Sequence, residues 1–439
     1  MPITRESMRS ALAPPTERAI RIGAAHLAHP ILHPIRFDLA DGLSPDEAAV
    51  LAVLVHPTLR ALRDREKLAR AQLLQAGLLP NPELSASLEP VVGGDTAGRV
   101  TAFGLGLGWD LAPLFSRPAK LDAARAHARS INLGVAWQEW RTAENARLQL
   151  YRLTLGRRRA AVAKKRASTL QRVFDQLQRG VDHQVSTIAD LAEAATALRQ
   201  GRVDLEEADA AVQEGGLALH RALGLPNIFR VRPAGDIRPP LLEAIPSVPE
   251  LVSDLEQRRL DLQALRLGYA SQEADVRAAI RAQFPRIEVR FTGARDTDGV
   301  ATIGPEITLA LPFLDRHKAR IARARATRKQ LFDEYAARLF AARSEIARLV
   351  QQAGALSHRI ARTDDAIQAL SRLAEQYRAA ADRGVAGILD SERARARGQG
   401  KILEKLALQE KFTEIEIALE IASGRVLVPD AGRDGKAGA

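Results

Sequence analysis

The sequence predicts a mainly α-helical protein with a small β part, in which one structural repeat occurs twice. Of its 439 residues, 4% are aromatic and 27% are charged, and Ala, Leu, Arg and Glu are abundant, as in long helices. Two long stretches carry apolar residues at alternating steps of three and four, the seam typical of coiled-coil packing. Short motifs also recur in the same order roughly 200 residues apart, which indicates a duplicated architecture.

The composition excludes several classes of site. The sequence contains no Cys, so disulfides, Cys-ligated zinc and thiol nucleophiles are excluded. No run of about 18 apolar residues is present, so we expect no transmembrane helix. The first residues contain no continuous apolar stretch, so the given sequence predicts no secretory signal peptide. Because aromatic residues are few, we also expect little compact core.

The repeat begins with two similar helix starts. Ser44-Pro45-Asp46-Glu47 and Ser247-Val248-Pro249-Glu250 share the S-x-x-E pattern of a capping box. In each half, a Pro-containing break, strand-like segments, a very long helix and a second helix follow in the same order. The second helices stop at Gly224 and Gly424, where a left-handed residue often ends a helix.

These signals divide the chain into five segments. Residues 1–43 form an N-terminal extension, 44–224 the first repeat, 225–246 a proline-rich linker, 247–424 the second repeat and 425–439 a flexible, glycine-rich tail.

The long helices are predicted from their seams, a clear apolar one over residues 332–377 and a weaker one of smaller residues over 146–177. Ser116 and Asp315 are the expected N-caps of these helices. Outside the seams both helices are charged, so each is expected to contact its neighbours along a narrow stripe.

We expect the long helices to break at Arg179-Gly180-Val181 and at Arg383-Gly384-Val385, because Gly permits a sharp turn. Residues 182–186 add about four residues to the first turn, so the second turn is the clearer of the two.

Four short strands are predicted from strict alternation of large apolar residues with small or charged ones. Four strands cannot close a barrel alone, and nothing else in the chain is predicted to cover their apolar faces. Strands from several chains could form one closed barrel, which would leave no free edges. The apolar face contains Leu84, Phe103, Leu105, Leu107, Trp109, Ile287, Val289, Phe291, Ile307, Leu309 and Leu311.

From about Ser44 to Gly424, the order and duplication of these pieces resemble the TolC family of outer-membrane efflux channel proteins. The segments that carry the resemblance are Ser44 to Ala49, His56 to Leu59, Ala76 to Leu84, Arg277 to Pro285, Gly304 to Phe313 and Asp315-Arg316.

The resemblance implies a homotrimer in which each chain gives four long helices and four strands. The strands would form one 12-stranded β-barrel in contact with outer-membrane lipid. The helices would form a periplasmic α-barrel. Such a protein is a passive exit duct of a tripartite efflux system, which docks on a periplasmic adaptor protein and an inner-membrane efflux pump. The implied location is the outer membrane with a periplasmic extension.

The resemblance also implies a docking tip at the two helix–helix turns, which contain Arg179, Gly180, Val181, Arg383, Gly384 and Val385. Asp382 and Asp390 are candidate gating charges there, although an Arg-Gly pair that simply ends a helix explains the same residues.

No motif points to catalysis, a cofactor or a resident metal, so we expect a protein that is not an enzyme. His26, His29 and His33 have ligand-like spacing, but prolines lie between them. The alternative function is a soluble, basic coiled-coil scaffold. Nucleic-acid binding, prompted by the net charge of +11, is not expected because aromatic residues for stacking are scarce. Membrane fractionation separates a duct from a scaffold.

Overall fold

The computed structural model describes residues 2–95, 97–227, 229, 231–235, 237, 239, 242, 244–311, 316–385 and 387–427. In the first half of the chain the elements are α1 (Arg5–Leu12), α2 (Glu17–Ala25), α3 (Pro45–Val55), α4 (Pro57–Gly77), β1 (Glu83–Glu89), β2 (Ala102–Asp110), α5 (Ala112–Asp182) and α6 (Ile188–Leu223). The second half contains α7 (Val248–Val252), α8 (Leu255–Arg258), α9 (Leu260–Arg281), β3 (Arg286–Arg295), β4 (Ala301–Ala310), α10 (Lys318–Asp382) and α11 (Ile388–Ser423).

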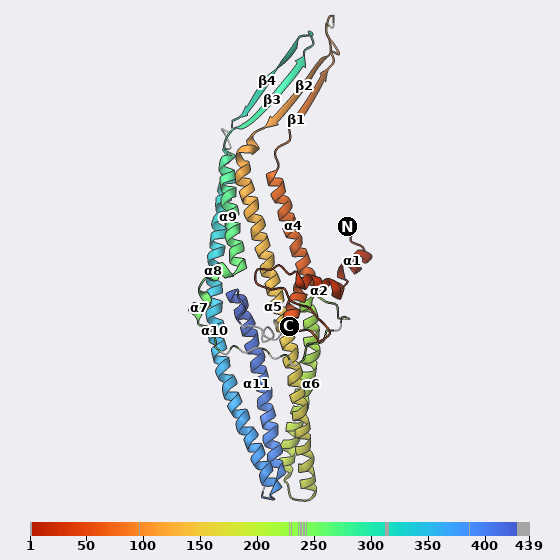
Figure 1. Cartoon of the computed structure of the whole chain (residues 1–439), viewed down its shortest axis with the longest axis vertical. Helices are drawn as coiled ribbons and strands as arrows, with labels where there is room; N and C mark the ends of the chain where they lie inside the picture. Colours follow the sequence, from red (N-terminus) through yellow and green to blue (C-terminus); the bar gives the residue numbers. More distant parts are fainter. Residues whose placement is uncertain are drawn as a thin grey trace. The chain divides into compact units, whose positions relative to one another are not determined.

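The two halves repeat one order of elements. A helix, two strands, a very long helix and a second helix follow each other as α4 to α6 and again as α9 to α11 (Figure 1). The predicted long helices are confirmed as α5, with 71 residues, and α10, with 65 residues.

The chain divides into two compact units. The helical unit contains Met1–Ala61, Ala136–Arg259 and Ala341–Ala439, and the sheet unit contains Leu62–Val135 and Leu260–Phe340. Each unit combines segments from both halves of the sequence, so the duplicated sequence does not fold as two successive domains.

The sheet unit carries the four strands, which pair antiparallel in the order β1-β2-β3-β4 (Figure 1). The central pair, β2 and β3, joins the two halves of the sequence, with Leu107 opposite Phe291 and Trp109 opposite Val289. Because side chains alternate along a strand, this register brings the large apolar residues of all four strands to one face.

The helical unit contains a hydrophobic core that the sequence did not predict. Ile20, Phe37 and Leu43 of the N-terminal extension pack with α3, with Leu150 of α5 and with Leu219 of α6, and all are at most 3% exposed. Apart from Phe37, the buried residues of this core are aliphatic, so the low aromatic content was a misleading signal.

The helix caps follow the sequence only in part. Ser44 and Glu47 form the predicted capping box, with the Glu47 N–H donating to Ser44 Oγ at 3.3 Å and the Ser44 N–H donating to Glu47 Oε2 at 2.9 Å. Ser247 caps α7, but Glu250 does not reach back and instead pairs with Arg425 at 3.2 Å.

The expected N-cap at Ser116 is wrong, because α5 already begins at Ala112 and Ser116 is buried inside it. The Ala112 N–H donates to Asp110 Oδ1 at 2.9 Å. The side chain of the last β2 residue therefore binds a backbone N–H group that has no partner within the helix. The other expected N-cap, Asp315, and tail residues 428–439 lie outside the described residues. Gly224 and Gly424 both end their helices with a φ of +70°, as predicted.

Candidate functional site at the helix turns

The first turn joins α5 to α6 within the helical unit. α5 ends at Asp182, and α6 begins at Ile188 after the N-cap Thr187, whose hydroxyl accepts the Asp190 N–H at 3.1 Å. Between them, Gln184 has a φ of +61°, in the left-handed region that few residues other than glycine adopt.

The second turn joins α10 to α11 in the same unit. α10 ends at Asp382, and α11 begins at Ile388 after the N-cap Gly387. Gly384 takes the left-handed conformation with a φ of +73°, and the Val385 N–H donates to the Ala380 carbonyl oxygen at 3.0 Å.

The two turns are equivalent when residue numbers differ by 200, as for Asp182 and Asp382 or Gly224 and Gly424. Under this correspondence the left-handed Gln184 matches Gly384. Val185 and Val385 also match, and they are 80% and 79% exposed. The expected insertion in the first turn is therefore wrong, since both turns contain the same number of residues.

Sequence reasoning placed the first break too early. Arg179, Gly180 and Val181 lie in the last turn of α5, and Gly180 is buried. A Cβ on Gly180 would lie 2.2 Å from Ser186 Oγ, so this glycine permits a close approach inside the chain rather than a left-handed turn. The matching Arg-Gly-Val motifs are thus out of register by about one helical turn.

Arg383, Gly384 and Val385, in contrast, lie in the second turn as predicted, and all are exposed. His183 to Val185, which the sequence analysis treated as part of an insertion, form the first turn itself and carry no glycine or proline. The only available signal was Thr187 three residues before Asp190, a pattern typical of a helix N-terminus.

A charged contact beside the turns joins α6 to α11. Asp190 Oδ1 lies 3.6 Å from an Arg393 guanidinium nitrogen, and Asp190 Oδ2 accepts the Thr187 hydroxyl at 2.5 Å. The Thr187 hydrogen bond first, and Arg393 second, hold the pKa of Asp190 below its usual range.

The two candidate gating charges differ from Asp190. Asp382 is exposed at the end of α10, and Asp390 is half-buried in the first turn of α11. Within the described residues, neither carboxylate forms a hydrogen bond or an ion pair, so both charges are available to other groups.

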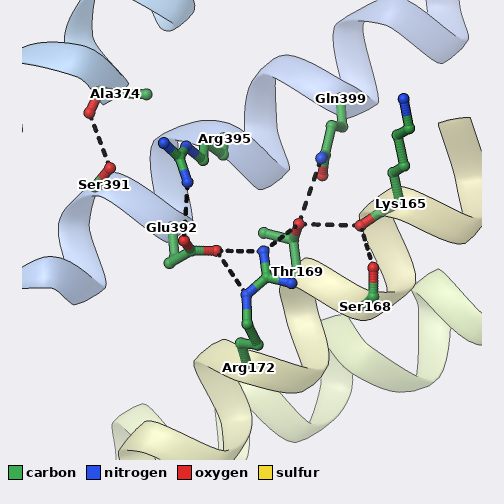
Figure 2. A network of polar contacts seen from close by, with 9 residues as sticks. All are labelled: Lys165, Ser168, Thr169, Arg172, Ala374, Ser391, Glu392, Arg395 and Gln399. Atoms are coloured by element: carbon green, nitrogen blue, oxygen red, sulfur yellow. Dashed lines mark hydrogen bonds and ion pairs between the residues drawn. The ribbon is translucent and has the colours of Figure 1, made fainter. Parts of the chain in front are cut away.

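Farther from the turns, a polar network joins α5 to α11 (Figure 2). Glu392 is 7% exposed, and its Oε2 accepts Arg172 Nη2 at 2.8 Å and Nε at 3.2 Å. Its Oε1 accepts Arg395 Nη1 at 3.1 Å. Thr169 Oγ1 then accepts both Arg172 Nη2 at 3.1 Å and Gln399 Nε2 at 3.3 Å. Charge-assisted hydrogen bonds therefore hold the α5–α6 hairpin against α11.

A second polar cluster is buried at the other end of α11. Glu144 of α5 is fully buried, and its Oε1 accepts Arg147 Nη1 at 2.8 Å, while Arg147 Nη2 donates to Asp46 at 2.5 Å. Burial raises the pKa of Glu144, against the opposing charge of Arg147.

Two glutamates of α11 in this region bind the chain segments that follow each repeat. Glu416 Oε1 accepts the Leu242 N–H at 2.6 Å, and Glu420 Oε1 accepts the Leu427 N–H at 2.7 Å. Burial raises the pKa of Glu416 to about 8, although the Leu242 hydrogen bond opposes this shift.

In the sheet unit, the predicted apolar strand residues share one face. Leu84, Leu107 and Phe291 lie opposite one another in successive strands, as do Trp109, Val289 and Ile307. These side chains are between 37% and 77% exposed. The other face carries glycines and polar residues, such as Arg290, which pairs with Glu288 at 2.7 Å.

The three N-terminal histidines show no arrangement for metal binding. Both ring nitrogens of His29 contact backbone groups, Nε2 at 2.9 Å from the Ala136 oxygen and Nδ1 at 3.0 Å from the Leu32 nitrogen. His26 Nδ1 lies 2.9 Å from the Ile22 oxygen. In the described part of the chain, no group of three or more His, Asp or Glu side chains could hold a metal ion.

Within the described ranges, every helix falls short of the length and apolarity that a membrane-spanning helix needs.

A family model matches much of the second half of the chain. The family model described as outer membrane efflux protein matches residues 251–425. This match covers α8 to α11 and both strands of the second hairpin.

Solved structures extend the likeness to nearly the whole chain. CusC, described in connection with transmembrane channel formation, has a TM-score of 0.70 at 18% identity, over 87% of this chain and 92% of that chain. VceC, an outer membrane protein of Vibrio cholerae, has a TM-score of 0.67 at 20% identity, over 87% and 96%. The outer membrane channel MtrE of Neisseria gonorrhoeae has a TM-score of 0.64 at 16% identity, over 92% and 96%.

At these identities the likeness shows the fold. The resemblance to TolC-like channels is confirmed, together with the mainly α fold class and its small β part. The matching family model is described as outer membrane efflux protein, and MtrE is described as an outer membrane channel. No sequence among curated proteins matches this chain.

Proposed function

We propose that this chain is the outer-membrane channel of a tripartite efflux system. Three copies form a passive exit duct, in which twelve strands close a barrel in the outer membrane and the helices extend into the periplasm. The two repeats, residues 44–224 and 247–424, give each chain equivalent parts of both structures.

The distribution of side chains over the two faces of the sheet supports this proposal. One face exposes large apolar side chains from all four strands, and the other carries glycines and charged residues. A lipid-facing barrel wall needs this distribution, with apolar residues toward the acyl chains and polar residues toward the lumen. Four strands of one chain leave two open edges, and hydrogen bonding between neighbouring chains would satisfy them.

The helix turns are the proposed docking tip for a periplasmic adaptor, behind which an inner-membrane pump supplies the energy. The exposed side chains of Val185 and Val385 offer apolar contacts, and Arg383 offers a positive charge. Arg179 and Val181 border this tip from the last turn of α5. Asp382 and Asp390 are proposed gating charges, because three copies of each around a channel axis would repel one another or bind cations.

Membrane location and channel activity test the proposal together. The full chain, directed to the secretion pathway of a Gram-negative host, is expected in the outer-membrane fraction. After purification in detergent it is expected to behave as a trimer and to conduct ions in a planar bilayer. A chain that stays a soluble monomer without detergent refutes the proposal and supports the coiled-coil scaffold.

Docking is tested separately with a tip variant, Val185→Asp with Val385→Asp. Loss of efflux in cells, with unchanged trimer formation and conductance, is the expected result. Val203→Asp, on the exposed surface of α6 away from the turns, is the matched control and is expected to retain efflux. Equal efflux by both variants would exclude the turns as the docking tip.

A further inference from the structure

A polar cavity lies in the sheet unit where the strands meet the helices. Its volume is about 350 Å³. Asp110 at the end of β2, Arg286 at the start of β3 and Leu311 after β4 form its strand side, and α5, α9 and α10 form its helix side. We call it the junction cavity.

The junction cavity collects positive charge from segments far apart in the sequence. Lys120 of α5, Arg281 of α9, Arg286 of β3 and Arg320 of α10 line it together with His317. Among the described lining residues, Asp110 supplies the one carboxylate, 3.9 Å from Arg286 Nε.

Two of these cations, Lys120 and Arg281, have no carboxylate partner in the described residues, whereas the carboxylate of Asp275 in α9 interacts electrostatically with Arg320. Lys120, Arg281 and Arg320 are all exposed. Holding like charges around one cavity is unfavourable unless an anion compensates them. The excess charge therefore points to an anionic ligand.

The same cavity has an apolar rim. Phe115, Phe284 and Leu311 contribute to its lining and are 52%, 68% and 51% exposed. Trp109, at the end of β2, donates its indole N–H to the Pro80 oxygen at 2.8 Å and is 37% exposed. Such amphipathic aromatic side chains favour the headgroup level of a bilayer.

Positive charge beside exposed apolar side chains matches a ligand that has an anionic head and a hydrocarbon tail. We propose that the junction cavity binds the phosphate of an anionic phospholipid from the membrane leaflet next to the helices. Lys120, Arg281 and Arg320 contact the phosphate, and the acyl chains lie along Phe284 and Leu311. This inference rests on the proposed membrane position of the sheet.

A free phosphate ion would satisfy the cations but not the apolar rim. The lipid therefore gains an attraction that inorganic phosphate lacks, of about 0.8 kcal/mol for each CH₂ group buried. A zwitterionic lipid has the tail but carries no net charge, so it is expected to bind more weakly than an anionic one.

Native mass spectrometry of the full chain in neutral detergent tests this inference. The probes are dioleoyl phosphatidylglycerol, dioleoyl phosphatidylcholine and inorganic phosphate. The triple variant Lys120→Gln, Arg281→Gln, Arg320→Gln is expected to lower phosphatidylglycerol affinity on the order of 100-fold, from roughly fivefold per cation.

The control triple variant is Arg129→Gln, Arg277→Gln, Arg325→Gln. It removes the same charge from exposed positions of the same three helices, and none of its residues lines the cavity. Its phosphatidylglycerol affinity is expected to stay within about twofold of the unsubstituted chain. Should the cavity variant fail to fold, the single variants Arg281→Gln and Arg320→Gln replace it, each with a loss of roughly fivefold.

Three results would overturn the inference: equal phosphatidylglycerol affinity in the cavity and control variants, equal affinity for phosphatidylcholine, or full displacement of the lipid by inorganic phosphate at equal concentration. Because binding is measured in detergent, it is independent of channel activity. A chain that conducts ions without binding phosphatidylglycerol refutes the lipid site alone, and one that binds the lipid without conducting refutes the channel alone.

Discussion

Replacing Glu416 with Gln is expected to stabilise the protein at neutral and alkaline pH and to leave its stability unchanged near pH 4. The carboxyl is 3% exposed, and burial raises its pKa from the ordinary 4.5 to about 8. Below pH 4.5 the group is protonated in both the folded and the unfolded chain. Between 4.5 and 8 the unfolded chain releases the proton that the folded chain retains, so stability falls as the pH rises.

The size of the effect follows from the same pKa values. The difference between 4.5 and about 8 corresponds to at most roughly 5 kcal/mol at 1.36 kcal/mol per pKa unit. Relaxation and water penetration reduce such costs, and we expect about half of this value. Gln retains a carbonyl oxygen that can accept the Leu242 N–H, so the hydrogen bond at 2.6 Å is preserved.

Thermal unfolding followed by circular dichroism between pH 4 and 8.5 measures the effect. An unfolding entropy of about 2.1 cal/mol/K per residue over the 439 residues converts the expected gain into roughly 3 °C of Tm at pH 8. Glu404→Gln, at an exposed position of the same helix paired with Lys401 at 2.8 Å, is the control and is expected to change Tm little at any pH.

A rise in Tm of the Glu416→Gln variant that does not depend on pH would refute the reasoning. The cost of burying an ionised carboxylate must vanish below pH 4.5, where the group is protonated. A loss of stability at every pH would equally refute it, since Glu416 would then act mainly as a charged partner.

Three further predictions concern the turn, the helix contact and the sheet. Gly180→Ala is expected to loosen the first turn, because its Cβ would meet a side chain at 2.2 Å, and limited proteolysis should cut there faster. Gly134→Ala, in open space on the same helix, should instead stabilise the chain by about 0.5–1 kcal/mol, and equal proteolysis of the two variants would contradict the contact. Arg172→Met is expected to lower the free energy of unfolding by about 1–3 kcal/mol, because the buried carboxylate of Glu392 loses hydrogen bonds. Hydrogen exchange at the start of α11 should become faster, and unchanged exchange there would contradict the prediction. Phe291→Lys should cost about 2–4 kcal/mol in membrane insertion and lower the amount of assembled trimer, whereas Thr292→Lys, on the opposite face, should be tolerated, and equal trimer yields would exclude a lipid-facing role.

The elements with strong periodicity were predictable. A seam of apolar residues at steps of three and four specifies a long helix wherever it continues, and α10 extends over all of the seam at 332–377. Alternation in β2, with Leu105 and Leu107 between glycines, likewise specified both the strand and its apolar face.

The register between the repeats was not predictable from motifs. Aligning the two repeats on their Arg-Gly-Val motifs shifts one repeat by about one helical turn from the alignment that the structure gives. The motif misleads because a tripeptide does not reveal whether its glycine turns the chain or permits a close contact. Gly384 adopts a left-handed φ, whereas Gly180 accommodates Ser186, and Gln184 provides the left-handed residue of the first turn.

Sequence alone determined the long helices, the strands and the apolar face of the sheet, since each depends on a period that one segment carries by itself. Tertiary structure decided which charged groups meet. Glu416 receives its raised pKa from burial beside Leu242, and the junction cavity combines Lys120, Arg281 and Arg320 from three helices. Such sites depend on distances between segments that are remote in the sequence, and no local pattern encodes those distances.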